Sequence, residues 1–248
     1  MSFRPTGMSP LASNHLRVWL PLLVEMSANS PFHDGRDTGF ASWRSVMRLG
    51  FPSLGPPPYV ESFDDYRRTA AAMADVGGMS FAELPFWDVR PHPRLPTLEV
   101  RCVDVPADAA DSAAIAAVVR ALVVTSARLV EQGDPGPRRS GELLRAAYWY
   151  ATRDGWKGQG VDALSGRMLS APERARRLVA HIGAALEESG DLERVTTFFD
   201  RLATRGTGAD RQRAAHLAGG FYAVVDDLVT CMTDSRTREE PDGAGGCA

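Results

Sequence analysis

Cysteine is scarce in this chain, with three among 248 residues. Cys102, Cys231 and Cys247 have spacings that match neither a zinc site nor a disulfide framework, and their odd number favours reduced thiols in a cytosol. We expect Cys102 to pack in the core and Cys247 to be an incidental thiol in the glycine-rich tail. The cysteines therefore indicate a cytoplasmic protein without a disulfide framework.

The sequence also lacks a long hydrophobic run and a basic stripe. The apolar run at residues 18–26 is too short to span a bilayer and contains Pro21 and Glu25, and nothing before it resembles a signal peptide. The net charge is −3, and the arginines alternate with acids along the expected helices. We therefore expect neither a membrane nor a nucleic acid as a partner.

Two common site motifs are missing as well. None of the five histidines pairs with a second histidine or a cysteine at metal-ligand spacing. Residues 205–208, Arg-Gly-Thr-Gly, lack the spacing of a phosphate-binding P-loop and are typical of a helix end followed by a Thr207 cap. The sequence thus excludes a P-loop and offers no histidine-based metal centre.

The patterning predicts an α+β fold with a mainly helical second half. In the first half we expect helices at 14–28 and 62–74, strands at 81–90 and 96–103, and a stiff proline-rich connector at 51–59, for which a polyproline ligand is the alternative. In the second half we expect a hairpin at 160–169 and helices at 109–131, 142–153, 172–188, 192–204 and 209–230, the last broken at Gly219 and Gly220. The predicted parts are 1–13, 14–105, 106–234 and a tail at 235–248.

The segment from Trp87 to Asp104 carries the strongest chemical pattern. A two-residue period places Thr97, Glu99 and Arg101 on one face of a strand and Leu98, Val100 and Cys102 on the other. Asp88 and Arg90 repeat the acid-x-arginine spacing. A carboxylate beside an arginine suits a site where Mg²⁺ meets a polyphosphate. The alternative is a cross-strand ion pair on a solvated sheet face.

Two further segments have open interpretations. The glycine-flanked loop at 30–44 carries Arg36 and Arg44, which suit an anionic ligand, although the loop could be a simple connector. The aromatic residues at 148–150, with Trp156, could stack on adenine, but core packing is the favoured interpretation.

The chain resembles the glutamate-cysteine ligase type 2 family of carboxylate-amine ligases. The resemblance covers residues 16 to 230 in family order, and it rests on LPLLVEMSANSPF (20–32), GRDTGFASWRS (35–45), FPSLGPPP (51–58), WDVRP (87–91), PTLEVRCVDV (96–105), ELLRAAYWYATRDG (142–155) and GTGADRQR (206–213).

This resemblance implies ATP-dependent amide formation through an acyl phosphate, with ATP and Mg²⁺ as cofactors and a small acid and an amine as substrates. It implies Glu99 as a metal ligand and Arg101 and Arg90 as catalytic phosphate contacts. It implies Arg36, Arg44 and Asp88 as substrate or phosphate contacts. The implied fold is an antiparallel sheet packed with helices, similar to glutamine synthetase and glutamate-cysteine ligase.

The sequence departs from the family at its start. Family members carry a long portion before the LPLL segment, with a G-x-E-x-E strand and an H-V-H-V-type strand, and neither motif occurs here. The family more often has serine at the position of His92 and histidine at that of Arg94. We therefore expect an N-terminally truncated ligase whose missing strands come from a second, N-terminal polypeptide or from a start codon placed too late, with a homo-oligomer as a further possible assembly; the alternative is a non-catalytic remnant that binds or scaffolds.

Overall fold

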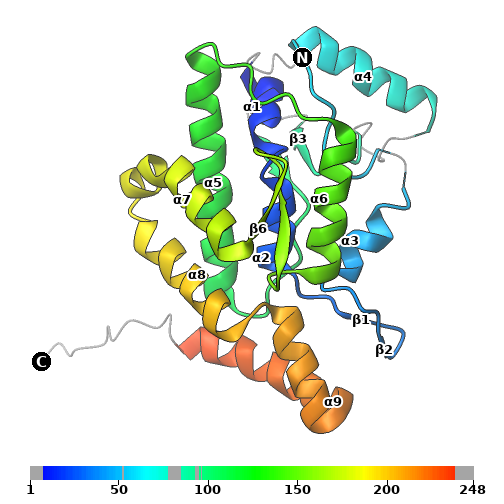
Figure 1. The fold of residues 1–248 in the computed structure, drawn as a ribbon, viewed down its shortest axis with the longest axis vertical. Coiled ribbons are helices and arrows are strands. Elements are labelled where there is room, and N and C mark those ends of the chain that lie inside the picture. The colour runs from blue at the N-terminus through cyan, green and yellow to red at the C-terminus, as the bar shows by residue number, and fades with distance from the viewer. Residues whose placement is uncertain (1–7, 52, 78–84, 93–94, 96, 238–248) are drawn as a thin grey trace, which may run out of the picture.

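The computed structural model describes residues 8–51, 53–77, 85–92, 95 and 97–237, and it shows an α+β fold dominated by helices (Figure 1). The helices of the first half are α1 (Met8–Leu16), α2 (Leu20–Ser27), α3 (Trp43–Arg48) and α4 (Phe63–Asp75). Those of the second half are α5 (Ala109–Glu131), α6 (Gly141–Asp154), α7 (Ala171–Glu188), α8 (Leu192–Arg205) and α9 (Gly208–Thr237).

The core is built around the two N-terminal helices, which run between α5 and α6 in Figure 1. Every residue of α2 is buried, including the polar residues Glu25 and Ser27 of this otherwise apolar helix. Helix α5 is long and apolar enough to cross a membrane by length and composition alone. It packs instead against α1, α7 and α8, and its buried side includes Ala114, Val118 and Leu122. One apolar cluster therefore contains residues from both predicted halves of the chain.

The predicted helix at 14–28 is wrong in its start and in its continuity. The first helix begins at Met8 and ends at Leu16, and a turn at residues 17–19 separates it from α2. Pro21 explains the break, because it has no N–H to donate to the carbonyl of Arg17 and its ring prefers the first turn of a new helix. The predicted helices at 62–74, 109–131, 142–153, 172–188 and 192–204 are confirmed to within one residue at each end. Helix α9 is kinked at Gly219 and Gly220 as expected, but it continues to Thr237, beyond the predicted end at 230.

The strands form short antiparallel pairs: β1 (Phe32–His33) with β2 (Arg36–Asp37), β3 (Val89–Pro91) with β4 (Leu98–Val100), and β5 (Gln159–Asp162) with β6 (Arg167–Ser170). The hairpin predicted at 160–169 is thus confirmed. The strands predicted at 81–90 and 96–103 are shorter than expected. Just before β3, the N–H of Asp88 bonds the carbonyl of Gly55 in the proline-rich connector and not the neighbouring strand. Residues 81–84 and 96 lie outside the described residues.

A buried ion pair joins α2 to α7. The guanidinium of Arg174, 3% exposed, bonds the carboxylate of Glu25, 1% exposed. A Cβ at Gly160 would come within 2.5 Å of the Arg174 head group, so glycine leaves the room that this side chain fills. Burial raises the pKa of Glu25 to about 7 even though Arg174 acts in the opposite direction. The folded protein therefore binds a proton here more tightly than the unfolded chain does.

This linkage predicts a pH-dependent stability. Because the folded-state pKa of Glu25 is raised, its favourable contribution is present at low pH and is lost as the pH rises from 4.5 through 7. We expect the free energy of unfolding of the wild type, relative to Glu25→Gln, to fall by roughly 2 to 3 kcal/mol between pH 5 and pH 8. Urea unfolding of both proteins at the two pH values measures the difference. Parallel pH profiles for the two proteins would show that Glu25 does not titrate in this range.

Candidate functional site

The β3–β4 register places Arg90 directly opposite Glu99. Arg90 Nε lies 2.9 Å from Glu99 Oε2, and His92 Nε2 lies 3.7 Å from Glu99 Oε1. The opposite face of the strand points inward as expected, with Leu98 packed against the core. The cross-strand ion pair is therefore present, and the Glu99 side chain remains 30% exposed and can be reached from solvent.

Asp88 is buried beside this pair, and each of its two carboxylate oxygens accepts a hydrogen bond. Tyr148 Oη donates to Asp88 Oδ2 at 3.0 Å, and Arg48 Nη2 donates to Asp88 Oδ1 at 2.9 Å. Burial raises the pKa of Asp88, and the nearby Arg48 opposes that rise. Asp88 thus orders the surrounding side chains from a position 5% exposed, where a substrate has little access.

Arg48 and Tyr148 were missed by the sequence analysis. Arg48 follows Arg44 by four residues on α3, so their shared helix face was a usable signal. Tyr148 belongs to the aromatic group for which core packing was favoured, and it is buried, as is Trp156, whereas Trp149 is 46% exposed. The hydrogen bond from the Tyr148 hydroxyl to Asp88 joins residues 60 positions apart in the sequence, so no local sequence pattern predicts it.

Arg101 differs from the other arginines of this cluster. Its main-chain carbonyl accepts hydrogen bonds from Arg44 Nη2, at 3.2 Å, and from Arg48. Its own Nη1 is buried without a hydrogen-bond partner, and in the described part of the chain no carboxylate lies within 4.0 Å of its guanidinium. Burial lowers the pKa of Arg101, and the positive charges of Arg90 and Arg48 lower it further. The cluster therefore has an excess of positive charge at Arg101.

Asp104 lies in the chain that follows β4 and forms hydrogen bonds with the loop at residues 28–45. Its Oδ2 accepts from the main-chain N–H of Asn29 at 2.9 Å and from Ser30 Oγ at 2.8 Å. Its Oδ1 accepts from Ser42 Oγ at 3.0 Å and lies 3.7 Å from Arg44 Nη1. Because Asp104 is 3% exposed, these contacts fix the start of α3 and hence the position of Arg44.

Arg36 is the predicted site residue that the structure does not bring to the cluster. It lies exposed in β2, opposite His33 in the β1–β2 hairpin. The next residue, Asp37, forms a two-pronged ion pair with Arg213, at 2.7 and 2.8 Å. The hairpin is thus anchored to α9, while Asp88, Arg90, Glu99, Arg101 and Arg44 gather around β3 and β4.

The charged cluster offers one accessible carboxylate, that of Glu99, as a ligand for Mg²⁺. Within the described residues, no group of three or more His, Cys, Asp or Glu side chains is arranged to hold a metal ion. Mg²⁺ is commonly held by one or two carboxylates together with substrate phosphates and water, so Glu99 can serve as one such ligand.

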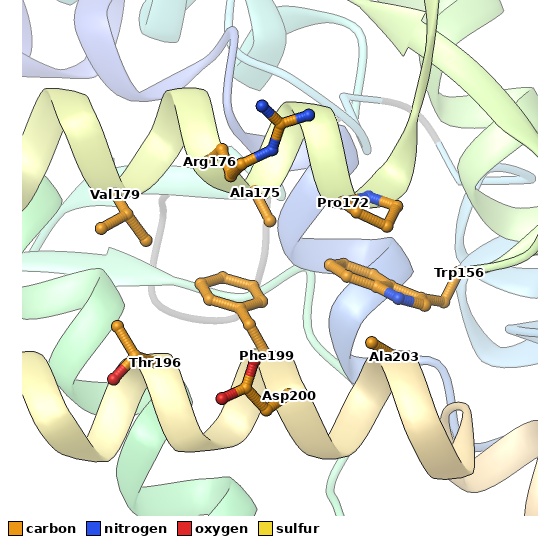
Figure 2. A pocket seen from close by; sticks show the side chains of 9 residues that line it. All are labelled: Trp156, Pro172, Ala175, Arg176, Val179, Thr196, Phe199, Asp200 and Ala203. Carbon is orange, nitrogen blue, oxygen red and sulfur yellow. The ribbon is translucent and has the colours of Figure 1, made fainter.

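An apolar groove of about 340 Å³ lies between α7 and α8, away from the cluster (Figure 2). The rings of Trp156 and Phe199 stack there, with centroids 5.8 Å apart. Arg176 and Asp200 also line the groove, but no residue of the charged cluster does. The groove therefore contains none of the residues that were predicted to bind substrate, phosphate or metal.

The hydrogen bond from Tyr148 to Asp88 gives a stability prediction. Tyr148→Phe removes the donor and leaves a buried carboxylate oxygen unsatisfied, so we expect a loss of roughly 1 to 3 kcal/mol in the free energy of unfolding. Tyr150→Phe, two residues along α6, is the matched control and should change stability by less than about 0.5 kcal/mol. Equal losses in the two variants, measured by urea unfolding, would argue against a stabilising role for this hydrogen bond.

Comparison with known proteins identifies the family. The model of glutamate-cysteine ligase family 2 matches residues 11–227. A protein of Nocardia farcinica is 41% identical over 94% of this chain and 61% of its own length, and one of Saccharopolyspora erythraea is 41% identical over 90% and 57%. One of Salinispora arenicola is 44% identical over 92% and 60%. All three are named "Putative glutamate--cysteine ligase 2", two of them with a numerical suffix.

This chain spans about three-fifths of the length of these curated relatives. The family match covers most of the chain, including α2, the β3–β4 pair and the start of α9. The chain belongs to glutamate-cysteine ligase family 2.

Proposed function

We propose that this chain provides part of the active site of an ATP-dependent carboxylate-amine ligase that acts in the cytoplasm. The observation that carries the proposal is the half-buried guanidinium of Arg101, whose Nη1 has no hydrogen-bond partner in a cluster that already holds Arg48 and Arg90. An anion placed there would supply the missing acceptor and offset the excess charge. A phosphate group suits this position, because guanidinium groups bind phosphate oxygens with two parallel hydrogen bonds.

The proposed reaction joins a small acid to an amine. The carboxylate oxygen of the acid attacks the γ-phosphorus of ATP, which forms an acyl phosphate and releases ADP. The amine nitrogen then attacks the acyl carbon, the bond to the phosphate oxygen breaks, the amine loses a proton, and the products are an amide and inorganic phosphate. Such a reaction needs positioning and charge stabilisation from the protein.

The proposed roles follow from where the side chains lie. Arg101 and Arg90 bind and stabilise the transferred phosphoryl group, and Glu99 supplies one oxygen ligand to Mg²⁺, which would offset phosphate charge when bound. Asp88 holds Arg48 in place through its 2.9 Å ion pair. Arg44 borders the site, whereas Arg36 lies on the exposed hairpin outside the cluster and has no role in the proposed chemistry. No nucleic acid or membrane takes part in this proposal.

The relatives are longer than this chain, which bears on whether this chain alone forms a complete active site. Among the described residues, Glu99 is the cluster's most accessible carboxylate, and a nucleotide with its metal ion needs further polar groups. We propose that polypeptide corresponding to the relatives' uncovered two-fifths supplies them. The second candidate function is binding without turnover, which the incomplete set of metal ligands favours.

The test measures ADP release and product by mass spectrometry. The full chain is incubated with Mg²⁺, ATP, glutamate and a mixed amino-acid pool, alone and with the segment of the Nocardia farcinica relative that this chain does not cover. We expect an amide product under at least one of these conditions. Arg101→Met should lower kcat/KM by about a hundredfold, the size of effect seen when one stabilising donor is removed.

Arg176→Met, in the α7–α8 groove, is the matched control and should leave kcat/KM within about twofold. Glu99→Gln should raise the Mg²⁺ concentration needed for half-maximal rate. ATP binding that depends on Arg101 without turnover under either condition would support the binding function and refute the ligase. Turnover that is unchanged in Arg101→Met would refute the proposed site.

A further inference from the structure

A second cavity lies beside the proline-rich connector. Its volume is about 350 Å³, and it lies between residues 53–58, α4 and the start of α6. Pro57, Pro58, Met73 and Trp87 give it apolar walls, and Arg17 and Arg145 bring positive charge to it. It shares no residue with the charged cluster around Glu99 and Arg101.

Arg17 is unusual among the buried arginines of the described chain. Arg90 and Arg174 are also buried, and each pairs with a glutamate, Glu99 or Glu25. Arg17 is 3% exposed, and no described carboxylate lies within 4.0 Å of it.

The remaining contacts of Arg17 leave it only partly satisfied. Its Nη1 donates to the main-chain carbonyl of Arg139 at 3.3 Å, and its Nε is buried without a partner. Burial lowers the pKa of Arg17, as expected when a cation is removed from water without a counter-charge. Keeping such a charge buried costs several kcal/mol unless an anion accompanies it.

The opposite side of the cavity is also positive. Gly141, the first residue of α6, lines it, so the amino-terminal end of a 14-residue helix faces this space. Arg145 Nη1 lies 4.0 Å from the point where a Cβ on Gly141 would stand. The nearest carboxylate to Arg145 is that of Glu142, 3.9 Å away and 87% exposed, which is a weak, solvated partner.

We propose that this cavity binds a small organic anion, a carboxylate or a phosphate monoester that carries an apolar body. The anionic group would lie between Arg17, Arg145 and the start of α6, and the apolar body would pack against Trp87 and the prolines. The volume is within the range of small-molecule sites. The apolar walls favour an organic anion over inorganic phosphate, because they would otherwise remain without an apolar contact.

The test uses benzoate and phenyl phosphate as probes, with benzyl alcohol as the uncharged control, and follows binding to the full chain by titration calorimetry. We expect saturable binding of at least one anion and none of the alcohol. The stronger of the two anions distinguishes a carboxylate site from a phosphate site. Quenching of Trp87 fluorescence, read as the difference between the wild type and Trp87→Phe, should occur over the same concentrations.

Arg145→Met should weaken this binding about tenfold or more, as expected for the loss of a charge-assisted hydrogen bond. Arg145 is 72% exposed in its side chain, so this variant should fold, and Arg17→Met should abolish binding if it folds as well. Arg176→Met, in the α7–α8 groove, is the control that should bind the probe as the wild type does. The cavity shares no residue with the charged cluster, so failure of the ligase proposal would leave this result unaffected.

Three outcomes would overturn the proposal. The first is the absence of saturable binding by either anion. The second is equal binding of benzyl alcohol, which would show an apolar pocket indifferent to charge. The third is an unchanged dissociation constant in Arg145→Met, which would place the anion elsewhere on the chain.

Discussion

The Glu25–Arg174 ion pair lies between α2 and α7, where both partners are almost completely removed from water. Burying the Arg174 guanidinium without an acceptor would cost several kcal/mol, so the two helices pack together with these side chains hydrogen-bonded to each other. The same requirement recurs around β3 and β4, where Arg90 faces Glu99 and Arg48 faces Asp88. Compensation of buried charge is thus the constraint that sets which helices and strands meet.

That constraint also identifies the places where compensation is incomplete. Arg101 has a buried nitrogen without an acceptor, and Arg17 is buried without a described carboxylate nearby. The buried arginines Arg90 and Arg174 are each paired with a glutamate. An external anion would therefore gain the most binding free energy at the two positions that lack such a partner. Both candidate sites of this protein therefore follow from a single electrostatic argument, applied at two positions with different surroundings.

The start of α9 shows how a distant segment supports the first of these positions. The N–H of Ala209 donates to the carbonyl of Ala28 at 3.0 Å, and Gln212 Nε2 donates to the carbonyl of Asn29 at 2.8 Å. A Cβ at Gly208 would overlap the side chain of Asn29, so this close approach requires glycine. The GTGADRQR motif thus holds the loop that leads to Arg44, which is a structural reason for its place in the family pattern.

Much of the local structure was predictable from the sequence, and most of the site was not. The two-residue period correctly separated Glu99 and Arg101 from the inward-facing Leu98, and the Thr207 cap marked the start of α9. These features depend on neighbours within a few residues. The contact between Tyr148 and Asp88 depends instead on how α6 packs beside β3, and the burial of Arg17 depends on a helix break that the periodicity did not reveal.

The charged cluster around Arg101 and the cavity beside Arg17 share structural elements. Trp87 lines the second cavity, and the next residue, Asp88, accepts the hydrogen bond of Tyr148 in the charged cluster. On α6, Arg145 and Tyr148 stand three residues apart and serve the cavity and the cluster respectively. A ligand in the cavity would therefore touch the residue next to Asp88 and the helix that carries Tyr148. If those contacts changed the affinity of Arg101 for phosphate, thermodynamic linkage would require phosphate to change the affinity of the cavity by the same factor.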